Sequence, residues 1–161
     1  MGSRDGEGTG TEDPDAGAGV PSGGDGDGSL YDAGTVGTGD CDQRVTSGLA
    51  SGKHNAGRDC LECHDGNHGA PHWTAAGTIY TAPTGGSALS GATIHLTDAA
   101  GKEIILVSTQ NGNFWTTDSI TFPLHARASS CPDDRLMGGA IPAGGCNQSG
   151  CHDSDMRIAL P

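Results

Sequence analysis

The sequence predicts a mainly β fold, in which a small β-sandwich follows a disordered acidic tail. Alternating apolar and polar runs recur about every 8–12 residues between Thr78 and Ala128, with turn signals between them, as in a sandwich. The chain has 161 residues, which is room for one domain and a tail. Leu, Ile, Val and Phe together number only 22, so the side chains alone predict a thin core.

Residues 1–40 form the predicted tail, a flexible linker rich in Gly and Asp. They contain 13 of the 29 glycines, and residues 1–44 carry ten acidic side chains against two basic ones. Such a segment cannot bury enough apolar surface to offset the entropy lost on ordering. We therefore expect it to stay disordered.

The first predicted strands have one apolar face each. Residues 78–80 form a short strand, and residues 92–97 alternate strictly. Within the second strand, Ile94 and Leu96 share the apolar face while His95 points to the other side.

The remaining predicted strands span residues 103–108, 114–117 and 124–128. The dipeptide Asn111-Gly112 is the strongest hairpin signal in the chain, and it precedes the second of these strands. His125 lies opposite the apolar face of the last strand. Residues 131–161 are rich in Gly and indicate loops.

The β-rich span resembles a known sandwich. The segments from Gly77 to Phe114, with GTIY, SGATIHLTDAAGK and NGNF in order, are similar to the carboxypeptidase-regulatory-like, transthyretin-like domain. This resemblance implies a small, mainly β sandwich.

The charge of −12 narrows the classes of partner. Nucleic acids and anionic membranes both require a basic face, so neither is expected as a partner. No apolar run reaches membrane-spanning length, and none resembles the core of a secretory signal. If the protein is exported, this chain lacks its signal peptide.

The segment Cys60-Leu61-Glu62-Cys63-His64 has the spacing of a c-type haem attachment motif. Two thiols must reach two vinyl groups on one edge of the porphyrin, and the next residue then lies beneath the ring. Only a His directly after the second Cys can bind the iron from there. Asp59 can cap the short helix that carries the motif.

A second motif begins at Cys146 and ends in Cys151 and His152. It keeps the Cys-His ending but places four residues between the thiols, where Gly150 eases the longer loop. It resembles the C-x4-C-H variant of small multihaem cytochromes. Two haems would also supply the apolar volume that the side chains lack.

Other uses of the cysteines stay open. Two cysteine pairs could form a four-thiolate zinc site, a redox dithiol or disulfides. None of these requires a His after the second Cys of both pairs, so covalent haem is the leading interpretation.

Each motif supplies one iron ligand, His64 for the first haem and His152 for the second. For the second ligand of the first haem we favour His54, which lies six residues before Cys60, with His72 as the alternative.

For the second haem we favour His125, which points off the apolar face, with Met137 as the alternative. A Met/His pair would raise the reduction potential relative to two His ligands.

Cys41 and Cys131 are left over, and neither is followed by His. In an oxidising compartment they could form a disulfide that closes a loop of about 90 residues. Free thiols or an intermolecular bridge are the alternatives.

The segments GKHNAGRDC, at residues 52–60, and AAGTIY, at residues 75–80, resemble a bacterial family of small multihaem cytochromes. The resemblance implies a two-haem domain over residues 41–161. Residues 41–75 would be the first haem segment, 76–130 the β-sandwich and 131–161 the second haem segment. It also implies electron transfer in the periplasm or the extracellular space.

The sequence thus predicts an electron carrier with two covalent haems, not an enzyme. Its expected partners are other cytochromes or redox proteins. Haems at the two ends of the domain could also connect stacked copies into a conductive filament. The competing hypotheses are a peroxidase- or reductase-like enzyme with one open iron site and a zinc- or disulfide-stabilised interaction module.

Overall fold

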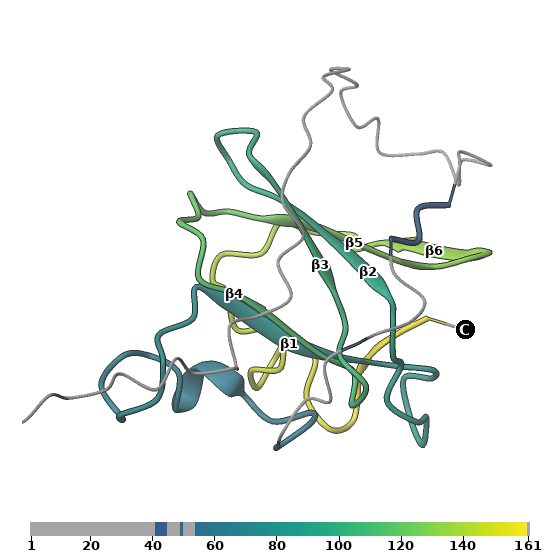
Figure 1. The fold of residues 1–161 in the computed structure, drawn as a ribbon, viewed down its shortest axis with the longest axis horizontal. Helices are drawn as coiled ribbons and strands as arrows, with labels where there is room; N and C mark the ends of the chain where they lie inside the picture. The colour runs from purple at the N-terminus through teal and green to yellow at the C-terminus, as the bar shows by residue number, and fades with distance from the viewer. Residues whose placement is uncertain (1–40, 45–48, 50–53, 161) are drawn as a thin grey trace, which may run out of the picture.

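The computed structural model describes residues 41–44, 49 and 54–160, and these form a two-layer β-sandwich (Figure 1). One sheet has three strands in the order β4-β1-β7, and the other has four in the order β3-β2-β5-β6. The elements are η1 (Cys60–Glu62), β1 (Ala75–Tyr80), β2 (Thr93–Thr97), β3 (Glu103–Val107), β4 (Asn113–Thr116), β5 (His125–Ser130), β6 (Asp133–Leu136) and β7 (Ile158–Ala159). The predicted fold class is confirmed.

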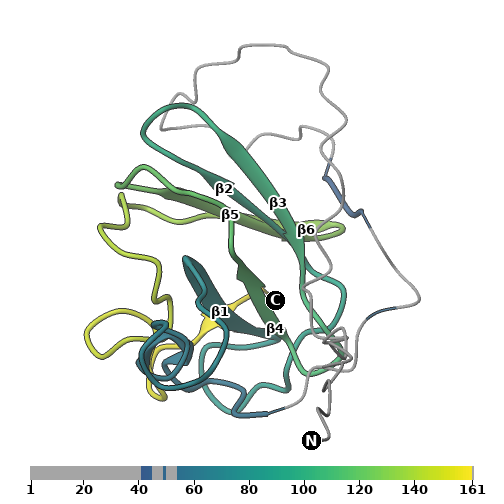
Figure 2. The ribbon, with the colours of Figure 1, turned by 60° about the vertical axis from the view of Figure 1, so that its left-hand side comes forward.

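The core lies between the two layers, which Figure 2 shows one above the other. The alternation predicted for β2 is confirmed, because Ile94 and Leu96 are 3% and 1% exposed. They face Ile79 and Phe114 of the three-stranded sheet within one buried cluster. Burial of such apolar side chains is the main force that holds the layers together.

The C-terminal part of the chain returns to the middle of the three-stranded sheet. β7 pairs in parallel with β1, with Ile79 opposite Ile158. Further along β1, the main chain of Ala76 bonds to Gly144 and Cys146, at 3.0 Å in each case. One strand, β1, therefore anchors two separate segments of the C-terminal part of the chain.

The hairpin prediction at Asn111-Gly112 was wrong. A tight turn does form there, with the N–H of Gly112 donating to the carbonyl of Thr109 at 2.9 Å. However, β3 pairs with β2 and β4 pairs with β1, so this turn carries the chain from one sheet to the other. The local signal specifies a reversal but not the strand that the next segment pairs with.

The segment predicted to be loops, residues 131–161, also contributes strands. β6 extends the four-stranded sheet and β7 extends the other. Both strands are short and β6 is polar, with the sequence DDRL, so neither has the apolar alternation that marks a strand.

Residues 41–44 lie against the outer face of the four-stranded sheet. The N–H of Arg44 donates to Thr93 Oγ1 at 3.0 Å, and Asp42 Oδ2 lies 3.2 Å from His95 Nε2. The predicted linker, residues 1–40, lies outside the described residues. Within the part that is described, no helix is long and apolar enough to cross a membrane.

Candidate functional site

The first cysteine motif forms a single helical turn beside β1. Asp59 caps this turn as predicted, because its Oδ1 accepts a hydrogen bond from the N–H of Leu61 at 3.0 Å. The N–H of His64 donates to the carbonyl of Cys60 at 3.0 Å. The turn leaves Cys60 half-buried and Cys63 exposed.

The imidazole of His64 is held in one orientation. It is 7% exposed, and its Nδ1 donates to the carbonyl of Pro71 at 2.8 Å. One face of the ring stacks on Trp73, with centroids 3.4 Å apart and planes 5° from parallel. The Nδ1 bond places the free electron pair of a neutral imidazole on Nε2, the atom available to a metal.

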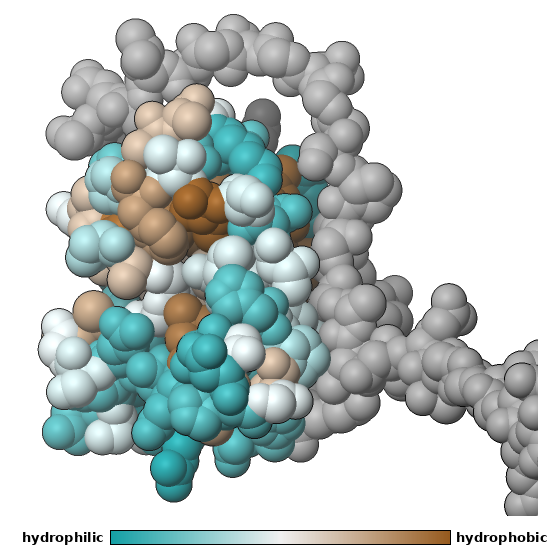
Figure 3. Space-filling model, turned by 90° about the vertical axis from the view of Figure 1, so that its left-hand side faces the viewer, coloured by the Kyte–Doolittle hydropathy of each residue, from teal (hydrophilic) through white to brown (hydrophobic). Residues whose placement is uncertain are grey.

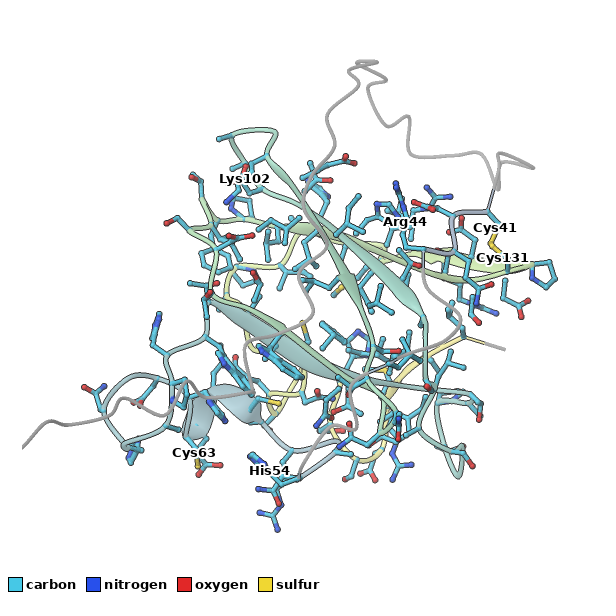
Figure 4. The ribbon with its side chains drawn as sticks, viewed as in Figure 1. Cys41, Arg44, His54, Cys63, Lys102 and Cys131 are labelled. Carbon is cyan, nitrogen blue, oxygen red and sulfur yellow. A yellow bond between two sulfur atoms is a disulfide. The ribbon has the colours of Figure 1, made fainter. Side chains whose placement is uncertain are left out.

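His54 lies near the same imidazole. Its ring centroid is 6.0 Å from that of His64, and the planes differ by 18°. The two rings are stacked, so the structure brings His54, the favoured second ligand, beside the imidazole of His64. Figure 4 shows His54 and Cys63 on the lower edge of the molecule, outside the sheets. His72, the alternative ligand, is exposed, and its side chain lies beside Gly66.

The second motif packs directly on β1. Cys146 is 8% exposed, and its N–H donates to the carbonyl of Ala76. The next residue of β1 is Gly77, where a Cβ would lie 2.8 Å from Cys146 Cβ and 2.7 Å from Phe114 Cζ. Only glycine at position 77 allows the cysteine to approach the strand this closely.

Asn147 connects the loop of the second motif to the sheet. Its Oδ1 accepts from the N–H of Thr78 at 2.7 Å, and its Nδ2 donates to the carbonyl of His152 at 3.0 Å. The Nδ1 of His152 in turn donates to the carbonyl of Met156 at 3.0 Å. His152 therefore also has its Nε2 free for a metal, as His64 does.

The two motifs lie next to each other, which corrects the expectation that they occupy opposite ends of the domain. Burial raises the pKa of the Cys146 thiol to about 12, and the charges of Cys60, Cys151 and Asp59 add to this rise. Burial, with the charge of Asp59, raises the pKa of Cys60 to about 11. Figure 2 shows η1 beside the yellow C-terminal loops. Both motifs meet because both pack on β1.

A cavity of about 490 Å³ opens between the two sheets beside the second motif. Its wall includes Cys146, Cys151 and His152, together with Met137. Its apolar lining includes Ile94, Leu96, Phe114, Ile141 and Leu160. A volume of this size, with a mostly apolar wall and a few polar groups, is typical of a cofactor site. Figure 3 shows apolar residues over the upper sheet, with hydrophilic residues around the lower half of that face.

His125 and Met137 are the two candidates for the second iron ligand of the second haem. They lie on opposite faces of the four-stranded sheet. His125 pairs with Thr97 on the outer face and is exposed. Met137 follows β6 on the inner face, where its N–H donates to the carbonyl of Ala126 at 2.9 Å. The structure therefore does not bring His125 to the cavity that His152 lines, and the preference for His125 over Met137 is not supported.

The disulfide predicted for the two remaining cysteines is present. Cys41 and Cys131 are joined, with Cα atoms 5.5 Å apart and a sequence separation of 90 residues. Figure 4 shows the bond at the end of β5 and β6, far from Cys63 and His54. It fixes the start of the described chain to the four-stranded sheet.

The motif residues are of the kinds that a c-type haem requires. Among the described residues no group of three or more His, Cys, Asp or Glu side chains could hold a metal ion. A haem needs fewer protein ligands, because the porphyrin itself supplies four nitrogens to the iron. Each motif offers two thiols and one oriented imidazole, and the second opens on an apolar cavity.

No protein family, curated protein or solved structure matches this chain. The resemblance to small multihaem cytochromes therefore stays a prediction. Trp73 and Asn147, which orient the motifs, were not among the residues predicted from the sequence. The sequence features that could have indicated them were weak. Trp73 is one of only two tryptophans, and Asn147 directly follows a motif cysteine.

Proposed function

We propose that this protein is an electron carrier with two covalently attached c-type haems. The main supporting observation is the matched geometry of the two motif histidines. His64 and His152 each donate from Nδ1 to a main-chain carbonyl, at 2.8 and 3.0 Å. Histidines that bind metals commonly make this bond, because it fixes the ring and leaves Nε2 for the metal.

The cysteines would hold the haems through thioether bonds. Each S–H adds across a vinyl double bond, so that sulfur bonds to one carbon, hydrogen to the other, and nothing leaves. Cys60 and Cys63 would hold the first haem, and Cys146 and Cys151 the second. Once bound, each iron supplies a one-electron couple, which is the chemistry that a carrier needs.

The placement of the motifs supports transfer within the protein. Both pack on β1, and Cys60 is close enough to Cys146 to raise its pKa. Neighbouring haems would share electrons inside one molecule. End-to-end stacking into a filament stays a prediction, and the placement of both motifs on β1 does not favour it.

The proposed setting is the periplasm or extracellular space, where c-type haems are attached and disulfides persist. The Cys41–Cys131 bond agrees with an oxidising compartment. A partner cytochrome or redox protein with a basic face would suit the net charge of −12. Association with such a partner should weaken as salt is added.

The test is to export the protein from a host that attaches c-type haems, and to measure its intact mass and visible spectrum. We expect two added haem masses. The double variants C60A/C63A and C146A/C151A should each lose one haem, whereas C41S/C131S should keep both. A colourless wild-type protein with the mass of the polypeptide alone would refute the proposal.

A further inference from the structure

The cavity between the sheets is large for a domain of this size. It is about 490 Å³ in volume, mostly apolar and partly open to solvent, and an apolar surface of this kind that is left uncovered indicates a bound group. The cavity exists because the inner face of β5 carries only small side chains, Ala126 and Ala128, opposite Leu96 and Ile94 of β2. These positions leave volume that larger residues would fill.

The groups on the cavity wall indicate what fills it. Cys146, Cys151 and His152 all line it, and so does Met137. We infer that the cavity holds the ring of the second haem, and that Met137 binds the iron on the side opposite His152. This inference rests on the proposed function, because it takes the covalent attachment of that haem for granted.

Met137 is suitably held for this role. It is half-buried on the inner face of the sheet, and its main chain bonds to that of Ala126 beside the cavity. A thioether is a common iron ligand in c-type cytochromes. His125, by contrast, is exposed on the outer face and would need the strand to turn over to reach the cavity.

Two of the three arginines that line the cavity suit the acidic groups of a haem, whereas the third, Arg127, is paired with Asp134. Arg157 lies with its guanidinium 4.5 Å from the ring centre of Tyr80 and donates to the carbonyl of Gly86 at 3.3 Å. Arg135 is exposed and lies on the inner face opposite Ala128, with no hydrogen bond or ion pair to the described residues. Guanidinium groups bind carboxylates well, so the haem propionates would lie at this rim.

The two haems would then differ in potential. The first has an exposed attachment cysteine, Cys63, and two imidazoles, His54 and His64, within 6.0 Å of each other. The second would lie in the apolar cavity between the sheets with a Met/His pair, which raises the potential. Electrons would therefore pass from the first haem to the second.

The test compares Met137→Ala with His125→Ala in the matured two-haem protein. His125 is the matched control, because it was the competing candidate ligand but is exposed on the outer face and is not part of the cavity wall. We expect M137A to lose the thioether-to-iron charge-transfer absorption, to lower the potential of one haem, and to bind one carbon monoxide when reduced. H125A should behave as wild type.

A second variant, Met137→His, separates ligation from packing. It should restore six ligands and suppress carbon monoxide binding, while the potential of that haem stays below wild type. Far-ultraviolet circular dichroism would verify that each variant is folded.

Two outcomes would overturn the inference while leaving the proposed function intact. One is a protein with two haems in which M137A changes neither potential nor carbon monoxide uptake. The other is a carbon monoxide site created by His125→Ala but not by M137A. A wild type without haem would instead refute the proposed function itself.

Discussion

The indole of Trp73 lies face to face with the imidazole of His64, at a centroid distance of 3.4 Å and an angle of 5°. The other neighbour in this stack is Trp115, 5.0 Å from Trp73. The only two tryptophans of the chain are thus both placed behind a motif histidine. Because a stacked ring cannot rotate freely, the two tryptophans fix the plane of the His64 imidazole. The hydrogen bond from Nδ1 to the carbonyl of Pro71 fixes the direction in which Nε2 points within that plane.

Replacing Trp73 with Leu should release the His64 ring. We expect a loss of about 1–3 kcal/mol of stability, from lost stacking and packing, and a shifted potential of the first haem only. Denaturant unfolding and a redox titration measure the two effects. Trp115→Phe, which keeps an aromatic ring in the stack, is the control and should change both much less. An unchanged first potential in W73L would contradict the positioning role.

Asn147→Ala should weaken the second motif. The substitution removes the acceptor of the buried Thr78 N–H and the donor to the His152 carbonyl, and Asn147 is 5% exposed. A buried donor left without a partner costs about 1–3 kcal/mol, so the unfolding midpoint in urea should fall. The control is Asn67→Ala, at an exposed position, which should change the midpoint much less. If both variants unfold at the same urea concentration, the two hydrogen bonds of Asn147 do not contribute to stability.

Removing the disulfide with C41S/C131S should destabilise the domain strongly. The bond closes a loop with a sequence separation of 90 residues, and the chain-entropy estimate for such a loop is about 4–5 kcal/mol. Thermal unfolding of the oxidised wild type, the reduced wild type and the double variant measures the effect. Reduced wild type and C41S/C131S should unfold alike, both well below the oxidised protein. Equal melting temperatures for all three would disprove the expectation.

Asp98 should make the stability of the sandwich depend on pH in the acid range. Its carboxylate accepts from the N–H groups of Ala100 and Lys102, each at 2.9 Å, and of Thr121 at 3.0 Å. These bonds, that of Thr121 foremost, hold the pKa of Asp98 below its ordinary value of 3.8. A lowered pKa stabilises the fold above that value and ceases to do so as the pH falls through the native pKa.

Asp98→Asn should therefore melt below wild type at pH 7, and the gap should narrow as the pH falls below 3.8 and the wild-type carboxyl takes up its proton. Melting temperatures from pH 7 to pH 2.5 measure this. The exposed Asp118→Asn is the control, and its difference from wild type should stay small throughout. A D98N gap that is constant over this range would exclude the linkage.

Much of the sandwich could be predicted from local pattern. Alternation in residues 92–97 placed Ile94 and Leu96 in the core and His95 outside it, because a strand turns successive side chains to opposite faces. The pairing of the strands could not be predicted this way. Asn111-Gly112 specifies a turn, but whether the next strand joins the same sheet depends on which distant strand offers a matching face.

The sequence by itself determined which residues could hold haem, since the Cys and His spacing within each motif is a property of a few adjacent residues. It also determined which cysteines were left to pair. Only the tertiary structure decided that both motifs meet on β1, that His125 faces outward, and that Met137 shares a cavity with His152. The physical reason is that these relationships join residues far apart in the chain. Strand pairing and the packing of two sheets bring such residues together, and no short segment encodes either.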